Sequence, residues 1–442
     1  MIRILKFMIG MCLFVFSLHA VSEQTKPEKV SKRLPDPLTL DHALSLADTQ
    51  HPDILLQDAK VREAKAHQEA VDSANAFHAY LDVASYAIDE DSQEFARRMD
   101  HNRAGIVISK TFYDFGHKSD LMGAAEQKIL SQQLELLDAR GRKRLEIMHA
   151  FFDVLLADIK FNQYNEAMAM GFIHLDRAQN RKELGRETDV KIAELQVEYQ
   201  KIRGLRAHSE NQQRETRAKL AEVLNYPNQL PANLVTPKLS NLRKKLPEIE
   251  TLQKQASEKN LKLQSLRHQL RSAEQELEAS RNADNPTIQA YVRAHEYDSV
   301  LGNTDEISGE LSITYDLYNP RHGANTAEKL STVYAARANL QKAESDLRQT
   351  ILSLWHKIEE LKLKQDEAQA FLEYREIYLE RNRALYEMEV STDLGTSMSE
   401  LTRAIHISAQ TDYQLAMAWY QMDLLTSNVQ MDTELTIKQP EQ

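Results

Sequence analysis

The residue types that carry out catalysis occur in the sequence, but not at the spacings that enzymes use. The 15 His residues are scattered, and pairs such as His101 and His117 have no ligand-like pattern of carboxylates near them. The motifs GxSxG, GxxxxGK, HExxH and GxGxxG are all absent. Solvated or packed histidines explain this pattern better than a metal site does. The sequence therefore predicts no enzyme, no metal site and no cofactor.

Two Thr-Asp pairs are the most suggestive polar feature of the chain. Thr188-Asp189 and Thr392-Asp393 each follow a short turn and begin a new helical pattern. A Thr or Asp at the start of a helix accepts hydrogen bonds from free backbone amides, and a carboxylate there favours the positive end of the helix dipole. One interpretation of both pairs is therefore helix capping.

The composition predicts few turns and long elements. Gly and Pro number 12 and 11 among 442 residues, so together they make about 5% of the chain where roughly 12% is ordinary. The net charge is −11, and −13 without Arg3 and Lys6, which argues against an acidic polymer as the main partner. The single cysteine, Cys12, lies in the first apolar run, so disulfide frameworks and thiolate metal sites are excluded.

The N-terminus is typical of a secretory signal peptide. Two positive charges precede a nearly uninterrupted apolar run from Phe7 to Leu18, with the small residues Ala20 and Ser22 after it. About twelve apolar residues are too few for a membrane-spanning helix, which needs roughly twenty. We expect a signal peptide at residues 1–22 and an extended segment at 23–38. No later run is long enough to span a membrane as a helix, so any insertion would use β-strands.

The remainder of the chain reads as two halves that repeat one pattern. Residues 108–111 match residues 311–314 at a separation of 203 positions, and residues 183–190 match residues 387–394 at 204. Earlier matches lie 209 positions apart, and the difference is absorbed in the polar segment 89–102. We expect a first repeat at 39–224, a Pro-rich irregular linker at 225–246, a second repeat at 247–428 and a C-terminal tail at 429–442.

Each half is predicted to contain a helix, a β-hairpin, a long helix and a shorter helix. Aromatic and β-branched runs predict hairpins at 80–115 and 287–318, with polar loops at 89–102 and 298–308. Proline-free tracts rich in Leu, Ala, Glu, Gln, Lys and Arg predict long helices, each of about 65 residues. The predicted helices are 52–79, 119–184, 188–224, about 260–282, 325–388, and about 37 residues after Thr392. The two shorter helices of each half together match the long one, so they can lie antiparallel along it as a coiled coil.

These features together resemble the TolC family of outer-membrane channel-forming efflux proteins. The resemblance covers nearly the whole chain after the signal peptide and depends on the order, spacing and duplication of its motifs. The matching segments are Leu40-Asp41-His42-Ala43-Leu44 with His51-Pro52, residues 108–116 with Ala124-Ala125-Glu126, residues 150–157, residues 185–190, and residues 220–227.

The resemblance implies a mainly α-helical chain with a small β part, and a homotrimer. In such a trimer each protomer gives four strands to one twelve-stranded transmembrane β-barrel, and its long helical hairpins to an α-barrel. The strands are long enough to cross an outer membrane, but four strands cannot close a barrel around a lumen, so several chains must cooperate. The implied location is the outer membrane, extending into the periplasm. The implied partners are a periplasmic adaptor protein and an inner-membrane transporter, with no nucleic acid.

The resemblance also assigns roles to the turns at the ends of the long helices. It implies that a trimer gathers six aspartates, Asp189 and Asp393 of each chain, around a periplasmic entrance, where they would favour cations and hold the entrance shut by polar contacts together with Thr188 and Thr392. This interpretation is compatible with capping. The tip residues that an adaptor would contact are Leu184, Gly185, Arg186, Met388, Glu389 and Val390. The first tip matches the family pattern in part, and the second lacks its glycine.

The aromatic and charged side chains of the strands and helices are interpreted from their positions. Seven aromatic residues crowd the strand ends and could form girdles at the membrane interface or simply pack in the hairpins. They are Phe112, Tyr113, Phe115, Tyr291, Tyr297, Tyr315 and Tyr318. Trp355 and Trp419 lie in helical stripes and are predicted to be core. The charged run 140–144 is predicted to be a solvated helix face.

The sequence thus predicts an outer-membrane channel-tunnel, the passive exit duct of a tripartite efflux pump or a type I secretion system. The alternative is a periplasmic coiled-coil scaffold whose hairpins are small sheets without a membrane barrel. The cargo and the particular pump do not follow from the sequence, because a wide lumen contacts its cargo unspecifically.

Overall fold

The computed structural model describes residues 33–46, 51–92, 95–299, 302–388 and 394–427. The chain divides into a short N-terminal unit, residues 1–35, and a second unit, residues 36–442, which contains every described helix and strand. The predicted signal peptide and the predicted C-terminal tail lie outside the described residues.

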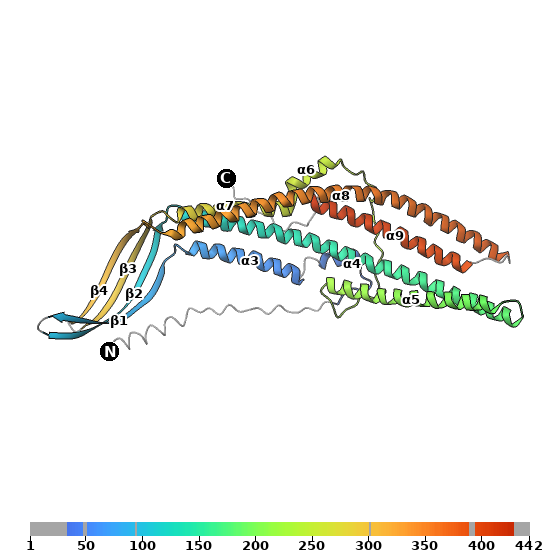
Figure 1. Cartoon of the computed structure of the whole chain (residues 1–442), viewed down its shortest axis with the longest axis horizontal. Helices are drawn as coiled ribbons and strands as arrows, with labels where there is room; N and C mark the ends of the chain where they lie inside the picture. The colour runs from blue at the N-terminus through green and yellow to red at the C-terminus, as the bar shows by residue number, and fades with distance from the viewer. Residues whose placement is uncertain (1–32, 47–50, 93–94, 300–301, 389–393, 428–442) are drawn as a thin grey trace. The chain divides into compact units, whose positions relative to one another are not determined.

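Two very long helices form the framework of the second unit (Figure 1). Helix α4 (His117–Glu183) has 67 residues and α8 (Pro320–Glu387) has 68, so each is about 100 Å long at 1.5 Å per residue. Both predicted long helices are confirmed. Helix α8 begins five residues earlier than predicted, because Pro320 is tolerated in a first turn and Asn319 caps it by accepting a hydrogen bond from the Arg321 backbone N–H at 3.2 Å.

The shorter helices lie along the two long ones, as Figure 1 shows. Helices α3 (Pro52–Ser73) and α5 (Asp189–Val223) pack on α4, and α7 (Leu261–Asn282) and α9 (Leu394–Leu425) pack on α8. Helices α7 and α9 also contact α4, so they join the two long helices into one assembly. The predicted packing of two shorter helices along one long helix is therefore confirmed.

One further helix end and two additional short helices differ from the sequence prediction. Helix α3 ends six residues early, because β-pairing already begins at His78, opposite Ser109. A short helix α2 (Leu40–Ser45) precedes α3, and α6 (Ile249–Lys259) precedes α7. Asn260 separates α6 from α7, where its side chain accepts from the Leu263 N–H at 3.1 Å and donates to the Leu425 carbonyl at 3.0 Å.

Residues of the predicted linker are hydrogen-bonded to two of the helices. Residues 225–246 contain no described helix or strand except an isolated parallel bridge between Leu234 and Leu38. The indole N–H of Trp419 donates to the Leu242 carbonyl at 2.9 Å, and that of Trp355 donates to the Pro247 carbonyl at 3.0 Å. Trp419 is buried, as predicted, and Trp355 packs at the edge of the same cluster.

The four strands form one antiparallel sheet in the order β1-β2-β3-β4. They are β1 (His78–Ser92), β2 (Phe95–Tyr113), β3 (Thr287–Ser299) and β4 (Gly302–Thr314). The predicted polar loops at 89–102 and 298–308 were wrong, because most of these residues continue the strands. The register places Asp89 opposite Arg98 and Glu90 opposite Arg97, and oppositely charged residue types at directly paired positions favour strand pairing.

The core consists of apolar stripes between the helices, with polar groups inserted at a few levels. Phe151 and Phe152 of α4 are almost completely buried, and Phe152 stacks on Tyr413 of α9 with ring centroids 4.3 Å apart. The predicted solvated face at 140–144 is wrong for Lys143, which is only 5% exposed. Its ammonium lies 3.0 Å from Glu146 of α4 and 3.4 Å from Asp53 of α3. The pair with Asp53 links the start of α3 to α4.

A polar layer between α4 and α7 gives a testable pH dependence. Glu135 accepts hydrogen bonds from Ser265 at 3.1 Å and Gln269 at 2.9 Å, and lies 3.3 Å from the Lys262 ammonium. Burial alone would raise the pKa of Glu135, but Lys262 and these hydrogen bonds lower it below its ordinary value of 4.5. Since the unfolded chain then binds the proton more tightly, this stabilisation is complete above pH 4.5 and disappears as the pH falls through the lowered pKa.

We expect Glu135→Gln to destabilise the protein by about 1 kcal/mol at pH 7. Thermal unfolding at pH 7 and at pH 3.5 tests this, because the variant should lose less stability than the wild type between those values. Glu278→Gln is the control, since Glu278 is exposed and pairs with Arg281 on its own helix. An equal loss of stability in wild type and Glu135→Gln would contradict the assignment.

Candidate functional site

The sheet has two chemically different faces. In an antiparallel sheet, directly paired residues lie on the same face. Leu81 pairs with Ile106, which pairs with Ala294, which pairs with Ile307. The neighbouring rows on this face are mostly apolar, and Lys110 and Glu296 are their charged members among the residues whose side chains are described. These rows contain Val83 with Ala104, Ala79 with Ile108, Val292 and Gly309, Ala290 with Leu311, and Ile288 with Ile313.

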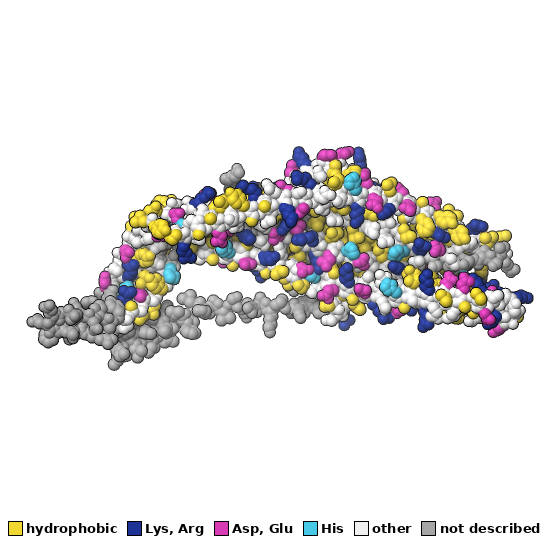
Figure 2. All heavy atoms as spheres, in the orientation of Figure 1, with side chains coloured by type: hydrophobic (Ala, Val, Ile, Leu, Met, Phe, Trp, Pro, Cys, Tyr) yellow, Lys and Arg dark blue, Asp and Glu magenta, His cyan; other side chains and the backbone are white. Residues whose placement is uncertain are grey.

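This apolar face is not covered by the rest of the described chain. Ile307 is 83% exposed, and Leu81, Val83, Leu311 and Ile313 are also exposed. In Figure 2 hydrophobic side chains are visible over the strands, together with charged side chains and a His. An uncovered apolar face of this extent on a sheet marks a surface that meets another apolar phase or another protein.

The opposite face carries polar and charged side chains. His295 of β3 is 8% exposed, and its Nε2 lies 3.1 Å from Asp82 of β1. The Arg103 guanidinium lies 2.9 Å from the same carboxylate. Arg293 and Glu310 form a further ion pair between β3 and β4 on this face. Strands that lie between lipid and a water-filled lumen alternate apolar and polar residues in this way.

A glycine makes the polar network possible. Gly105 pairs with His295, whose imidazole lies directly over it. A Cβ at Gly105 would lie 2.3 Å from the Ala294 carbonyl oxygen and 2.4 Å from the His295 ring. Only glycine leaves room for the ring to cross the strand and reach Asp82.

The strands continue beyond the apolar face. The register adds further pairs on both hairpins, up to Ser92 with Phe95 on the first and Ser299 with Gly302 on the second. The residues that follow Val83 on the apolar side include Ser85, opposite Asn102, and Asp89, opposite Arg98. The apolar surface therefore forms a band between the helices and the polar ends of the hairpins.

The predicted aromatic residues gather mainly at the end of the band near the helices. Phe112, Tyr113 and Phe115 are exposed, and Tyr113 and Phe115 contact each other edge to face with centroids 4.7 Å apart. Tyr315 and Tyr318 are exposed as well but lie just beyond β4, so the predicted strand was four residues too long. Tyr291 instead lies within β3 on the polar face, and the side chain of Tyr297 lies outside the described residues.

Capping interactions fix the junction between the strands and the long helices. Asp114 accepts hydrogen bonds from the Lys118 backbone N–H at 3.0 Å and from Asn75 at 3.1 Å. Gly116 at φ 100° lets the chain turn from β2 into α4. Asn282 of α7 donates to Asp120 of α4 at 2.6 Å. The turn after β2 is thereby joined to the segment between α3 and β1, and the start of α4 is joined to α7.

The first helix tip is fully described. Thr188 is the N-cap of α5 and accepts from the Lys191 N–H at 3.2 Å. Asp189 is exposed and forms an ion pair with Lys182 of α4. Gly185 has a φ of 69°, the left-handed conformation that closes α4, and the neighbouring Leu184 is 70% exposed. At the second tip Met388 is exposed, whereas Glu389, Val390, Thr392 and Asp393 lie outside the described residues.

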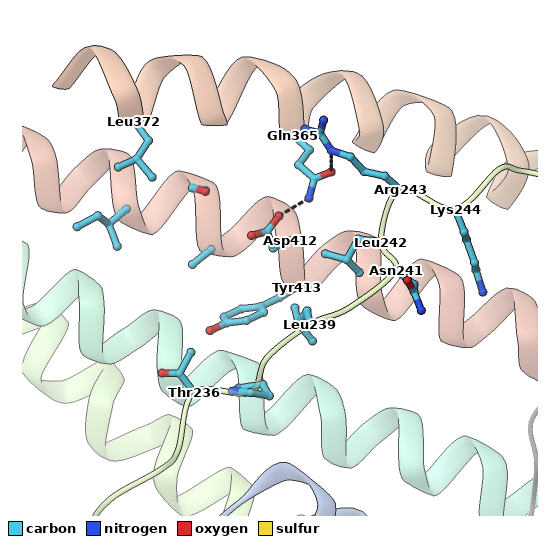
Figure 3. Close-up of a pocket in the computed structure, with 14 residues that line it drawn as sticks. Thr236, Leu239, Asn241, Leu242, Arg243, Lys244, Gln365, Leu372, Asp412 and Tyr413 are labelled. Carbon is cyan, nitrogen blue, oxygen red and sulfur yellow. Dashed lines mark hydrogen bonds between the residues drawn. The ribbon is translucent and has the colours of Figure 1, made fainter. Parts of the chain in front are cut away.

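A groove of about 770 Å³ lies where the linker crosses α8 and α9 (Figure 3). Three of its polar side chains form a hydrogen-bonded chain. Gln365 accepts from the Arg243 Nε–H at 3.2 Å and donates to Asp412 at 2.6 Å. Burial raises the pKa of Tyr413, which also lines it. The described residues contain no group of His, Cys, Asp and Glu that could hold a metal ion. Residues of the linker between Thr236 and Lys244 line one side of this groove.

Among the described residues, no helix has both the length and the apolar character needed to cross a membrane.

The comparisons with known proteins agree on the fold. No family model and no curated protein matches the sequence. Solved structures match over most of the chain. The outer-membrane channel OprN has a TM-score of 0.71 and 12% identity over 88% of this chain and 90% of its own. The Campylobacter jejuni CmeC outer membrane channel has a TM-score of 0.69 and 14% identity over 88% of this chain and 85% of its own. The Vibrio cholerae outer membrane protein VceC has a TM-score of 0.68 and 13% identity over 87% of this chain and 94% of its own. The chain thus has the fold of these solved outer-membrane channels.

Proposed function

We propose that this protein is an outer-membrane channel-tunnel, the passive exit duct of a tripartite efflux pump or a type I secretion system. The observation that carries the proposal is the sheet with one uncovered apolar face and one charged face, attached to helices about 100 Å long. The likeness to solved outer-membrane channels supports it. A periplasmic scaffold would have no use for an apolar band on its strands.

The sheet edges support assembly as a trimer. Strands β1 and β4 are the two edges, so each has one row of backbone N–H and C=O groups without a strand partner among the described residues. In an antiparallel order of four strands, β4 of one chain can pair antiparallel with β1 of the next. Three copies then give twelve strands, which is enough to enclose an aqueous lumen, whereas four strands are not.

The helices expose matching apolar faces on both sides. On α8 the exposed residues include Leu363, Tyr374 and Ile377, while Val190 and Val197 are exposed on α5. Helix α5 packs mainly on α4, whereas α8 packs on α6, α7 and α9, so the two exposed faces belong to opposite ends of the helix order. Side-by-side association of copies would bury both faces.

The helix tips would face the periplasm and meet the partners. Leu184 and Met388 are exposed at the ends of α4 and α8, and small exposed apolar groups of this kind suit contact with helical hairpins of an adaptor protein. The energy for transport would come from an inner-membrane transporter, because the enzyme motifs sought in the sequence are missing.

The aspartates at the tips give a test of the channel. Replacing both Asp189 and Asp393 by Ala should raise single-channel conductance in planar bilayers and weaken selectivity for cations, because six carboxylates would leave the entrance. Asp58→Ala on α3, where Asp58 pairs with Arg62, is the control that should leave both unchanged. Unchanged traces in the double variant would leave the aspartates as helix-end residues only. Absence of channels in the wild type would contradict the proposed function itself.

A further inference from the structure

One cation interrupts the apolar face of the sheet. Lys110 of β2 pairs with Ala290, which pairs with Leu311, so Lys110 lies in a row of that face. This row contains no residue of β1, because β1 begins at His78, opposite Ser109. The other charged side chain described on this face, Glu296, lies toward the opposite end of the band. Lys110 therefore lies at the edge of the band that is nearer to the helices.

Aromatic rings hold the Lys110 ammonium. Its Nζ lies 4.5 Å from the centroid of Phe77 and 5.6 Å from that of Phe112, and both rings are exposed. Within the described part of the chain Lys110 has no ion pair, in contrast to Lys118, which pairs with Asp72 at 3.1 Å. The nearest carboxylate in sequence, Asp114, is occupied by Asn75 and the Lys118 N–H. The ring contacts fix the position of the charge without using its N–H donors.

The surroundings of Lys110 define the chemistry of a ligand. On one side the face continues with Ile108, two residues along β2 and about 7 Å away, which suits an acyl chain. On the other side lie the exposed rings Tyr113 and Tyr315, and aromatic rings of this kind prefer the membrane–water boundary. An ammonium on a flexible stem at that boundary binds phosphate as a point charge.

We propose that Lys110, flanked by Phe77 and Phe112, binds the phosphate of an anionic phospholipid in the membrane leaflet nearer to the helices. The headgroup contacts the ammonium, and the acyl chains lie along the apolar rows of the sheet. A trimer carries three such sites. This inference rests on the proposed function, since it needs the apolar face to be surrounded by lipid.

Purified trimer in a neutral detergent tests the site. The probes are short-chain phosphatidylglycerol, short-chain phosphatidylcholine and inorganic phosphate, and the readouts are the thermal unfolding midpoint and native mass spectrometry of bound lipid. We expect phosphatidylglycerol to raise the midpoint of the wild type and of Lys110→Arg, and Lys110→Gln to bind it about tenfold more weakly. Lys65→Gln is the matched control, because Lys65 is an exposed lysine of α3, away from the sheet.

The outcomes separate this inference from the proposed function. Equal binding of phosphatidylglycerol by the wild type and Lys110→Gln would overturn the lipid site. So would a response to inorganic phosphate as large as the response to the lipid. A wild type that forms stable trimers but does not distinguish the two lipids would overturn the site and leave the channel proposal standing. A wild type that forms no trimer would overturn both.

Discussion

Replacing Gly105 by Ala is expected to abolish most assembly of the protein. The new Cβ would lie 2.3 Å from the backbone oxygen of Ala294, which cannot move without breaking the β2–β3 ladder, and 2.4 Å from the His295 ring. Overpacking of this kind costs about 1–3 kcal/mol in ordinary cores. We expect a cost at the upper end of that range, because the clash involves a backbone atom. The cost arises three times in a trimer, once in each copy. The measurement is the yield of detergent-extracted trimer, which should fall about tenfold or more.

Gly309→Ala is the matched control for Gly105→Ala. Gly309 also lies in the sheet, on β4, but a Cβ there would meet no atom within 4 Å. We expect a near-normal yield of trimer from this variant. If both variants assembled equally well, the close crossing of His295 over Gly105 would be contradicted, and with it the network between His295, Asp82 and Arg103.

The second large effect is expected from a charge on the apolar face. Ile108 lies in the middle row of the band, opposite Ala79 and Val292. An Arg on the lipid-facing side of a strand near the bilayer centre costs about 2–4 kcal/mol. We therefore expect Ile108→Arg to prevent stable insertion, so that the protein is lost from the outer-membrane fraction or degraded. Immunoblotting of fractionated membranes measures this.

Ser109→Arg separates the effect of the face from the effect of the substitution. Ser109 is the next residue of β2 and lies on the polar face, opposite His78 and Tyr291. A lumen-facing Arg should change conductance but leave insertion intact. Insertion of Ile108→Arg at the wild-type level would show that this face does not meet lipid and would favour the scaffold interpretation.

The helical part of the fold follows closely from the sequence. The residues of α4 and α8 have high helix propensity and no internal proline, and Pro320 and Thr188 mark helix starts by their own chemistry. Helices α2 and α6 were not predicted, and pairing at His78 shortened α3. Long, locally determined elements of this kind depend little on partners far away in the chain.

The sheet and the candidate site were harder to predict for a physical reason. Polarity at 89–102 indicated a loop. The register instead places Asp89 opposite Arg98, and oppositely charged residue types at paired positions allow a polar segment to continue a strand. The two faces emerge only when the register is known, because residues such as Ile108 and Val292 are far apart in sequence. The alternation of apolar and polar residues within β4, from Ile307 to Ile313, was the available signal for the band.

Two details of the structure could not have come from the sequence. The contact between Gly105 and His295 joins β2 to β3 across 190 positions of the chain. The burial of Lys143 reverses what its charged neighbours in sequence indicate. In both cases a tertiary neighbour, rather than the local pattern, decides the environment of the side chain.

The most direct test of the channel proposal is the state of the protein in native membranes. Cells are treated with a chemical crosslinker, the membranes are separated on a density gradient, and the fractions are blotted for the protein. The proposal predicts a band at about three protomer masses in the outer-membrane fraction, extracted only by detergent. A monomer released with the soluble periplasmic fraction by osmotic shock would contradict it.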